Sequence, residues 1–195
     1  RFSLVYDVAL YPIELTSASL IGRPFTTPGS ATMKGAGGVL KLSLETYTPE
    51  ISFADLNLDN LRFYLKGQSQ HIHPLYQLLR HECTGIVIST SKENSQPIFL
   101  DSDIIKPVGF NSEEGLLPYP PSSFIGYRLL TEYFVFPEKF MFIDLANLNK
   151  HFHENIKNKL DIYIYLSSSD IELEHNIERE TFALGCAPGI NLFEQ

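Results

Sequence analysis

The chain has 195 residues, of which 44% are hydrophobic and 19% are charged, and its formal net charge is -8. This composition excludes a disordered, collagen-like or low-complexity chain, and the length suits one ordinary domain or two small ones. With 15 basic and 23 acidic residues, the chain lacks the basic surface that general nucleic-acid binding requires. No apolar run approaches the roughly 18 residues of a membrane-spanning helix, so we expect no nucleic-acid partner and no direct membrane insertion.

The residues before 112 show mainly the period-two alternation of strands. Leu40, Leu42 and Leu44, for example, fall on one face of a predicted strand and alternate with polar residues. Glycines and prolines punctuate residues 22–38, which indicates a long surface loop. We predict strands over residues 2–10, 39–47, 61–66 and 86–90, one or two short strands within 97–110, and a helix over 71–82.

The residues after 112 begin with a proline-rich divider at 111–123. A helix is predicted from there to about Phe134, and because its apolar residues surround most of the cylinder, we expect burial on more than one side. Leu148, Phe152 and Ile156, spaced four apart, predict a further helix. The predicted elements are strands over 140–145 and 160–166 and helices over 123–134 and 147–159.

These elements predict a β-rich mixed fold of the α+β class. The order strand, helix, strand occurs twice, at residues 61–90 and 140–167. The divider indicates two lobes: a β-rich lobe with one helix over residues 1–112, and an α+β lobe over 113–195 that begins with a proline-rich segment and a buried helix. The two cysteines, Cys83 and Cys186, lie far apart outside any CxxC motif and are predicted to be reduced thiols of a cytosolic protein.

The search for catalytic motifs gives no convincing site. The glycine-rich run at 35–38 leads into a predicted strand, whereas a phosphate-binding loop leads into a helix. A GxSxG motif is absent. The paired histidines allow a metal-dependent hydrolase as an alternative, and a β-sandwich module that binds carbohydrate or peptide remains another. The hydrolase would use His71, His73, His151 and Glu154, although zinc ligands on a helix are usually spaced four apart. We therefore predict no catalytic residue, no metal and no cofactor.

The segment with the most specialised composition joins Leu and Tyr to closely spaced prolines at 115–121 and continues into the aromatic helix. Such a segment either packs over its own domain or docks on a neighbouring protein. The candidate anchors, buried or facing a partner, are Leu116, Leu117, Tyr119, Tyr127 and Arg128.

The same region, GLLPYPPSSFIGYRLLTEYFVFPEKFMFIDL over residues 115–145, resembles the TssF family of type VI secretion baseplate subunits. Shorter matches are LDNLRFYL at 58–65, LYQLL at 75–79 and TFALGCAPGINLF at 181–193, with RPF at 23–25 as a weaker one. Members of this family are several hundred residues long, and this chain begins with Arg1 rather than Met. We therefore expect it to be an internal portion of a longer protein.

The resemblance implies a structural scaffold in the wedge of the baseplate, which supports assembly of the contractile sheath around the spike hub. It implies no enzymatic activity and carries over no catalytic or cofactor-binding residue. The partners that it implies are a TssG-like wedge subunit, a second copy of the protein itself, a TssK-like adaptor, a TssE-like sheath initiator and the spike hub. The implied location is the cytoplasm, at the inner-membrane face.

Overall fold

The computed structural model describes residues 2–28, 33–90, 97–117, 119–120, 123–152 and 156–191. Their strands form antiparallel sheets. One sheet has the order β2 (Ile13–Gly22), β3 (Gly38–Thr46), β9 (Lys159–Leu166), β5 (Cys83–Ser89), β6 (Ile98–Leu100). The next has the order β10 (Phe182–Ala183), β4 (Leu61–Leu65), β8 (Phe142–Leu145), β7 (Ile105–Pro107). A small ribbon pairs β1 (Ser3–Leu4) with β11 (Gly189–Ile190).

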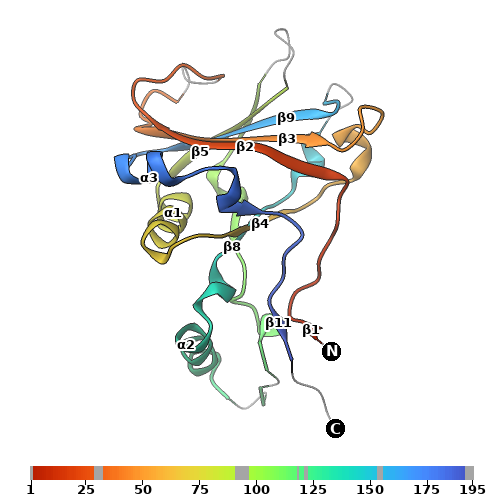
Figure 1. Ribbon diagram of the computed structural model, residues 1–195, viewed down its shortest axis with the longest axis vertical. Coiled ribbons are helices and arrows are strands. Elements are labelled where there is room, and N and C mark those ends of the chain that lie inside the picture. The colour runs from red at the N-terminus through yellow and green to blue at the C-terminus, as the bar shows by residue number, and fades with distance from the viewer. Residues whose placement is uncertain are drawn as a thin grey trace.

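The sheet that contains β9 lies across the top of the molecule, with the sheet that contains β4 beneath it (Figure 1). The α-helices are α1 (Ser69–His81), α2 (Ile125–Val135) and α3 (Ile171–Asn176). Short 3-10 turns occupy Phe53–Leu56, Ser102–Ile104, Ser112–Glu114, Pro137–Phe140, Leu148–Lys150 and Arg179–Thr181. Helices α1 and α3 lie close below the upper sheet, whereas α2 lies apart at the lower end (Figure 1). This mixture of sheets and helices confirms the predicted α+β class.

Strand β9 lies between β3 and β5 in the middle of its sheet, and both of its faces are covered by packed side chains. On its inner face, Ile162 and Ile164 enter the core between the two sheets. On its outer face, Tyr163 and Tyr165 pack with Val39 and Val87 beneath the segment that joins β2 to β3, from which Phe25 and Met33 contact them. The predicted loop at 22–38 is this connection, of which residues 29–32 lie outside the described part.

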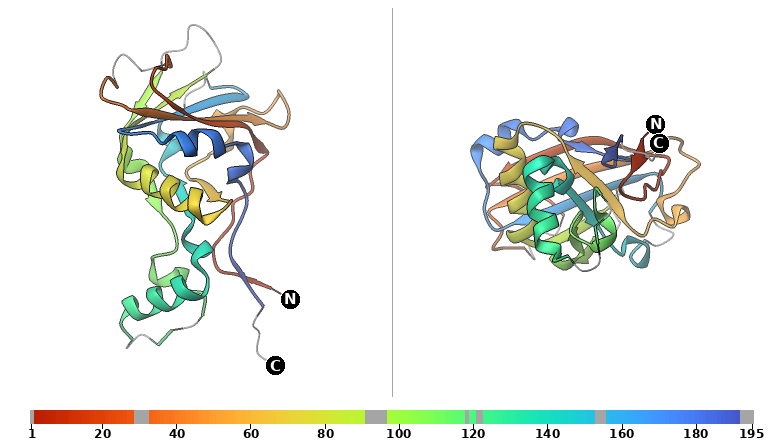
Figure 2. Two further views of the ribbon diagram at one scale, coloured as in Figure 1. Left: turned by 60° about the vertical axis from the view of Figure 1, so that its left-hand side comes forward. Right: turned by 90° about the horizontal axis from the view of Figure 1, so that it is seen from below.

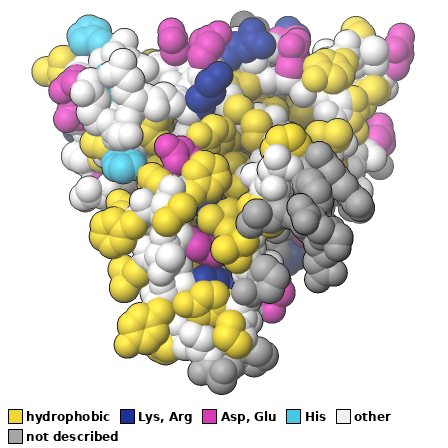
Figure 3. Space-filling view, turned by 60° about the horizontal axis from the view of Figure 1, so that its bottom comes forward, with side chains coloured by type: hydrophobic (Ala, Val, Ile, Leu, Met, Phe, Trp, Pro, Cys, Tyr) yellow, Lys and Arg dark blue, Asp and Glu magenta, His cyan; other side chains and the backbone are white. Residues whose placement is uncertain are grey.

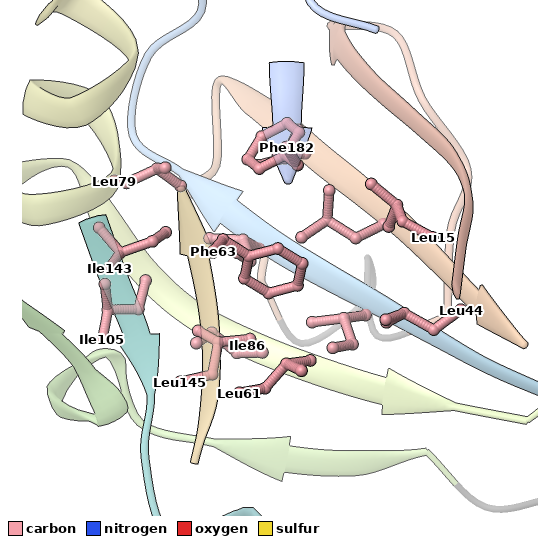
Figure 4. Close-up of a cluster of buried hydrophobic side chains, with 14 of the residues drawn as sticks. Leu15, Leu44, Leu61, Phe63, Leu79, Ile86, Ile105, Ile143, Leu145 and Phe182 are labelled. Carbon is pink, nitrogen blue, oxygen red and sulfur yellow. The ribbon is translucent and has the colours of Figure 1, made fainter. Parts of the chain in front are cut away.

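The core between the two sheets is continuous. Phe63 of β4 is fully buried at its centre and packs edge-to-face against Phe182 of β10, with ring centroids 5.9 Å apart. Figure 4 shows side chains from both sheets and from α1 pointing toward this region, including Leu44, Ile86 and Leu79. The predicted strands at 39–47, 61–66 and 160–166 and the helix at 71–82 therefore form the frame of this core, within one or two residues at each end.

The predicted helix over 147–159, and with it the second strand–helix–strand unit, is wrong. Between β8 and β9 the described residues form only one 3-10 turn, and Asn147 has a left-handed backbone with φ of 59°. The carbonyl groups of residues 156–158 instead accept hydrogen bonds from Ser52, Phe53 and Thr46. Leu148 and Ile156 are buried, so their spacing reflects separate anchors of an irregular segment rather than a helical stripe.

The predicted boundary between residues 112 and 113 does not separate the sheets. The upper sheet takes β9 from the second half of the chain, and the lower sheet takes β8 and β10 from it. What lies apart is a smaller unit around α2, at the lower end of the molecule in each side view (Figures 1 and 2). We call the described residues between 109 and 140 the α2 lobe.

Candidate protein–protein interface

Helix α2 turns its charged side chains inward and its apolar side chains outward. Arg128 is 5% exposed and Glu132 is 6% exposed, whereas Tyr127 is 66%, Leu130 is 59% and Phe134 is 80% exposed. The expectation that this helix is buried on more than one side is therefore wrong. One face contacts the rest of the lobe through Arg128 and Glu132, the partly buried Leu129 packs against the core, and the opposite face is apolar and open to solvent.

The buried face of α2 is anchored by charge-assisted hydrogen bonds to the segment before it. Arg128 donates from Nη1 to the carbonyl of Ser112 at 2.7 Å and from Nη2 to that of Asn111 at 2.6 Å. Glu132 Oε1 accepts from the backbone N–H of Leu116 at 2.7 Å. Because buried charges are tolerated only with such partners, these bonds fix the orientation of α2 within the lobe.

Lys139 joins this network from the 3-10 turn that follows α2. Its side chain is fully buried, and its Nζ donates to the carbonyl of Gly109 at 3.0 Å and forms an ion pair with Glu132. Burial lowers the pKa of Lys139 below its ordinary value, and the hydrogen bond to Glu132 opposes that shift. The network thus holds both ends of the lobe to the middle of α2.

The α2 lobe is also joined to the N-terminal segment. The hydroxyl of Tyr6 donates to the backbone carbonyl of Lys139 at 2.9 Å, and its ring packs edge-to-face on Phe142 at 5.5 Å. Burial, with the nearby carboxylate of Glu114, raises the pKa of Tyr6 above 10.0. Tyr6 therefore serves as a fixed contact between the N-terminal segment, the lobe and the lower sheet.

A groove of about 650 Å³ lies between the β1–β11 ribbon and the α2 lobe. Four of the five predicted anchors line it, namely Leu116, Leu117, Tyr119 and Arg128. Leu117 is 50% exposed, so part of its surface faces the open groove. The fifth predicted anchor, Tyr127, does not line the groove and belongs to the outward face of α2. Pro118, Pro121 and Ser122, from the same predicted segment, lie outside the described residues.

The outward face of α2 contains residues that the sequence reasoning did not select. Besides Tyr127 it contains Leu130 and Phe134, and Phe124 and Val135 extend it at 69% and 75% exposure. Hydrophobic side chains gather over this lower end of the molecule (Figure 3). The signal that was available is the spacing of Arg128 and Glu132, four residues apart, because they are the only charged residues of α2 and mark one polar stripe.

In the part of the chain that the structure describes, the histidines proposed for a metal site do not form a cluster. His71 contacts Glu172 at 3.2 Å, and His73 is an exposed residue of α1. His151 follows the 3-10 turn at Leu148–Lys150, and Glu154 lies outside the described residues. In the described ranges no three His, Cys, Asp or Glu side chains are grouped so as to hold a metal ion.

A second cavity, of about 370 Å³, lies beside the start of β4. Its one guanidinium, Arg62, donates from Nε and Nη2 to the two carboxylate oxygens of Asp144, both at 2.7 Å, and stacks on Tyr6. The guanidinium of Arg62 and the carboxylate of Asp144 therefore form a structural ion pair. Cys186 also lines this cavity, and it and Cys83 are free thiols, as the sequence predicted. Among the described helices, none is long and apolar enough to span a membrane.

Comparisons with known proteins give matches over nearly the whole chain. Residues 1–195 match the family model described as "Type VI secretion system, TssF". The type VI secretion component TssF1 of Pseudomonas aeruginosa PAO1 is 32% identical over 196 residues, which covers 99% of this chain and 31% of that protein. The chain thus spans about a third of the length of this relative.

A solved structure has the same fold. It is a cryo-electron microscopy structure of a type VI secretion TssK–TssF–TssG baseplate subcomplex, matched with a TM-score of 0.79 at 24% identity. The match covers 98% of this chain and 34% of the chain in that structure. Together with the family model over all 195 residues, these findings show that the chain belongs to the TssF family of the type VI secretion system.

Proposed function

We propose that this chain is part of a non-enzymatic scaffold subunit of the type VI secretion baseplate, and that its α2 lobe docks on neighbouring subunits. Membership of the TssF family supports the baseplate role. The single observation that carries the docking role is the inverted polarity of α2, with Arg128 and Glu132 buried and an apolar face exposed. An exposed apolar patch of this kind marks an interaction surface in soluble proteins.

The partners that we propose first are TssG-like and TssK-like subunits, since the solved subcomplex with this fold is named for TssK, TssF and TssG. We further propose a place in the wedge that supports sheath assembly at the inner-membrane face, with a second copy, a TssE-like sheath initiator and the spike hub as neighbours. Family membership supports this finer picture.

The groove beside α2 offers such docking a wall of apolar side chains that is held in a fixed position. The groove is walled by Leu116, Leu117 and Tyr119, and the buried network around Glu132 and Lys139 keeps this wall at a fixed angle to the helix. Interfaces obtain most of their affinity from a few buried aromatic and aliphatic anchors in ordered positions. A pre-organised lobe reduces the entropy that docking would otherwise cost.

The test is co-purification of the protein that carries this chain with the TssG-like and TssK-like proteins of the same genome. The double variant Leu117→Asp and Tyr119→Asp places two charges in the groove wall, and we expect its affinity for the complex to fall at least 100-fold. The matched control is Ile171→Asp, which charges a residue 73% exposed at the start of α3, away from the groove. Unchanged assembly by a folded double variant would refute the proposed docking role.

A further inference from the structure

The outward face of α2 indicates the kind of element that covers it. We propose that α2 receives an uncharged stripe of an amphipathic helix from a partner subunit, packed along the helix itself. This inference rests on the proposed function and adds the secondary structure and chemistry of the partner element. It follows from the spacing, the area, the neutrality and the backbone chemistry of the exposed face.

The spacing of the outward residues is that of a helix-packing surface. Tyr127, Leu130, Thr131 and Phe134 stand at positions i, i+3, i+4 and i+7, and all four are exposed. Anchors at these intervals form the ridge that packs against a second helix. Thr131 is tied to the helix by its hydroxyl, which donates to the carbonyl of Tyr127 at 2.8 Å. The ridge is therefore continuous over two turns.

The uncovered area is close to that of one side of a protein interface. Phe124, Tyr133 and Val135 flank the ridge at 69%, 43% and 75% exposure. Since an aromatic side chain offers roughly 150–250 Å², the ridge and its flanks leave on the order of 600 Å² in water. That is at the upper end of the largest patches on monomers, about 300–600 Å², and approaches the roughly 800 Å² per partner of a standard interface.

The charge of the exposed face selects the chemistry of its partner. Both charged residues of α2, Arg128 and Glu132, point inward and are bonded to the lobe. The exposed residues of the helix are Thr131 and otherwise uncharged apolar or aromatic residues, while Leu129 packs partly buried against the core. A charge brought against this face would lose its water without gaining a partner. The contacting stripe of the partner is therefore uncharged.

The backbone chemistry of α2 favours a helix over an extended segment as this partner. The backbone groups of a helix interior are already bonded along the helix, so its side offers no backbone donors or acceptors to a partner strand. An extended segment laid on the apolar face would bury its own N–H and C=O groups without partners. A helix satisfies those groups internally and brings only side chains to the contact.

The experiment combines charge-introducing variants with site-specific cross-linking in the complex of the full protein with its TssG-like and TssK-like subunits. Tyr127→Glu near the start of α2 and Phe134→Lys near its end follow the helix dipole, so both variants should fold as the parent does. We expect the protein that carries both substitutions to lose affinity for the complex at least 100-fold, and the control Ile171→Lys on α3 to lose none. A photo-reactive phenylalanine analogue at Tyr127 or Phe134 should cross-link to partner residues spaced three or four apart.

Each other outcome contradicts a defined part of the inference. Cross-links to partner residues two apart would indicate an extended segment, and cross-links to a second copy or to the same polypeptide would replace the partner. If Leu117→Asp with Tyr119→Asp dissociates the complex while Tyr127→Glu with Phe134→Lys does not, docking uses the groove, and this inference fails although the proposed function stands. If neither pair has an effect on the folded protein, the proposed docking role fails as well.

Discussion

Replacement of Lys139 by methionine tests whether the buried charge network holds the α2 lobe. Methionine keeps most of the side-chain volume but removes the ammonium that contacts Glu132 and the carbonyl of Gly109. The Glu132 carboxylate, 6% exposed, then keeps only the N–H of Leu116 and a distant guanidinium, Arg128 Nε at 4.0 Å. Breaking a buried pair in this way costs about 3–5 kcal/mol, so we expect Lys139→Met to lower the free energy of unfolding by that amount.

The double variant Lys139→Met with Glu132→Leu removes both charges and should lose less stability than the sum of the single variants, by about 1–3 kcal/mol. Urea denaturation followed by far-ultraviolet circular dichroism suits this chain, which contains no tryptophan. Lys106→Met, at an exposed lysine of β7, is the control and should change stability by at most about 0.5 kcal/mol. A loss below about 1 kcal/mol for Lys139→Met, or additive single effects, would refute the reasoning.

Three further predictions concern a phenol, a thiol and the core. Tyr6→Phe should cost about 0.5–1.5 kcal/mol at pH 8, because it removes the hydrogen bond to the carbonyl of Lys139. The pKa of Tyr6 in the folded protein is raised above 10.0, so as the pH rises its phenol ionises first in the unfolded chain, which lowers the free energy of unfolding. Urea titrations at pH 8 and pH 11 should therefore show stability falling with pH, and falling less steeply in Tyr6→Phe. Burial raises the pKa of Cys83 from 9.0 to about 11. In a Cys186→Ser background, a disulfide reagent at pH 8 should therefore label the Cys83 thiol of the native chain at least about 100-fold more slowly than that of the urea-unfolded chain. Equal labelling rates would contradict this prediction. Phe63→Ala should lower the free energy of unfolding by about 3–5 kcal/mol, and a loss below 1 kcal/mol would show that the core is not centred on this ring.

The sheets were predictable because their strands carry the alternation that two packed sheets impose. Leu40, Leu42 and Leu44 alternate with polar residues, and in the structure they fill the core while Lys41 and Ser43 are half-buried. The pairing of these strands was not predictable, since alternation determines which face a residue occupies and not which strand lies beside it. For the same reason the apparent two lobes proved to share both larger sheets.

The site was only partly predictable because exposed and buried aromatic residues look alike in a sequence. The apolar residues of α2 suggested a helix surrounded by protein, yet they lie outward because Arg128 and Glu132 find backbone carbonyls and an N–H group in the preceding segment. These partners come from an irregular stretch without a sequence signature. Leu116, Leu117 and Tyr119 of the proline-rich segment line one groove together with Arg128 of α2, and their role as anchors stays a prediction.

The position of β9 has a consequence for how the chain reaches its native state. This strand, at residues 159–166, lies between β3 and β5, and even the later of these two, β5, ends at residue 89, long before β9 begins. During synthesis the edges of β3 and β5 that pair with β9 therefore have no native partner until residue 166 has left the ribosome. Such non-local pairing is slow and leaves strand edges open to aggregation. Expression below 30 °C, or with a chaperone that shields unpaired edges, should therefore raise the soluble yield.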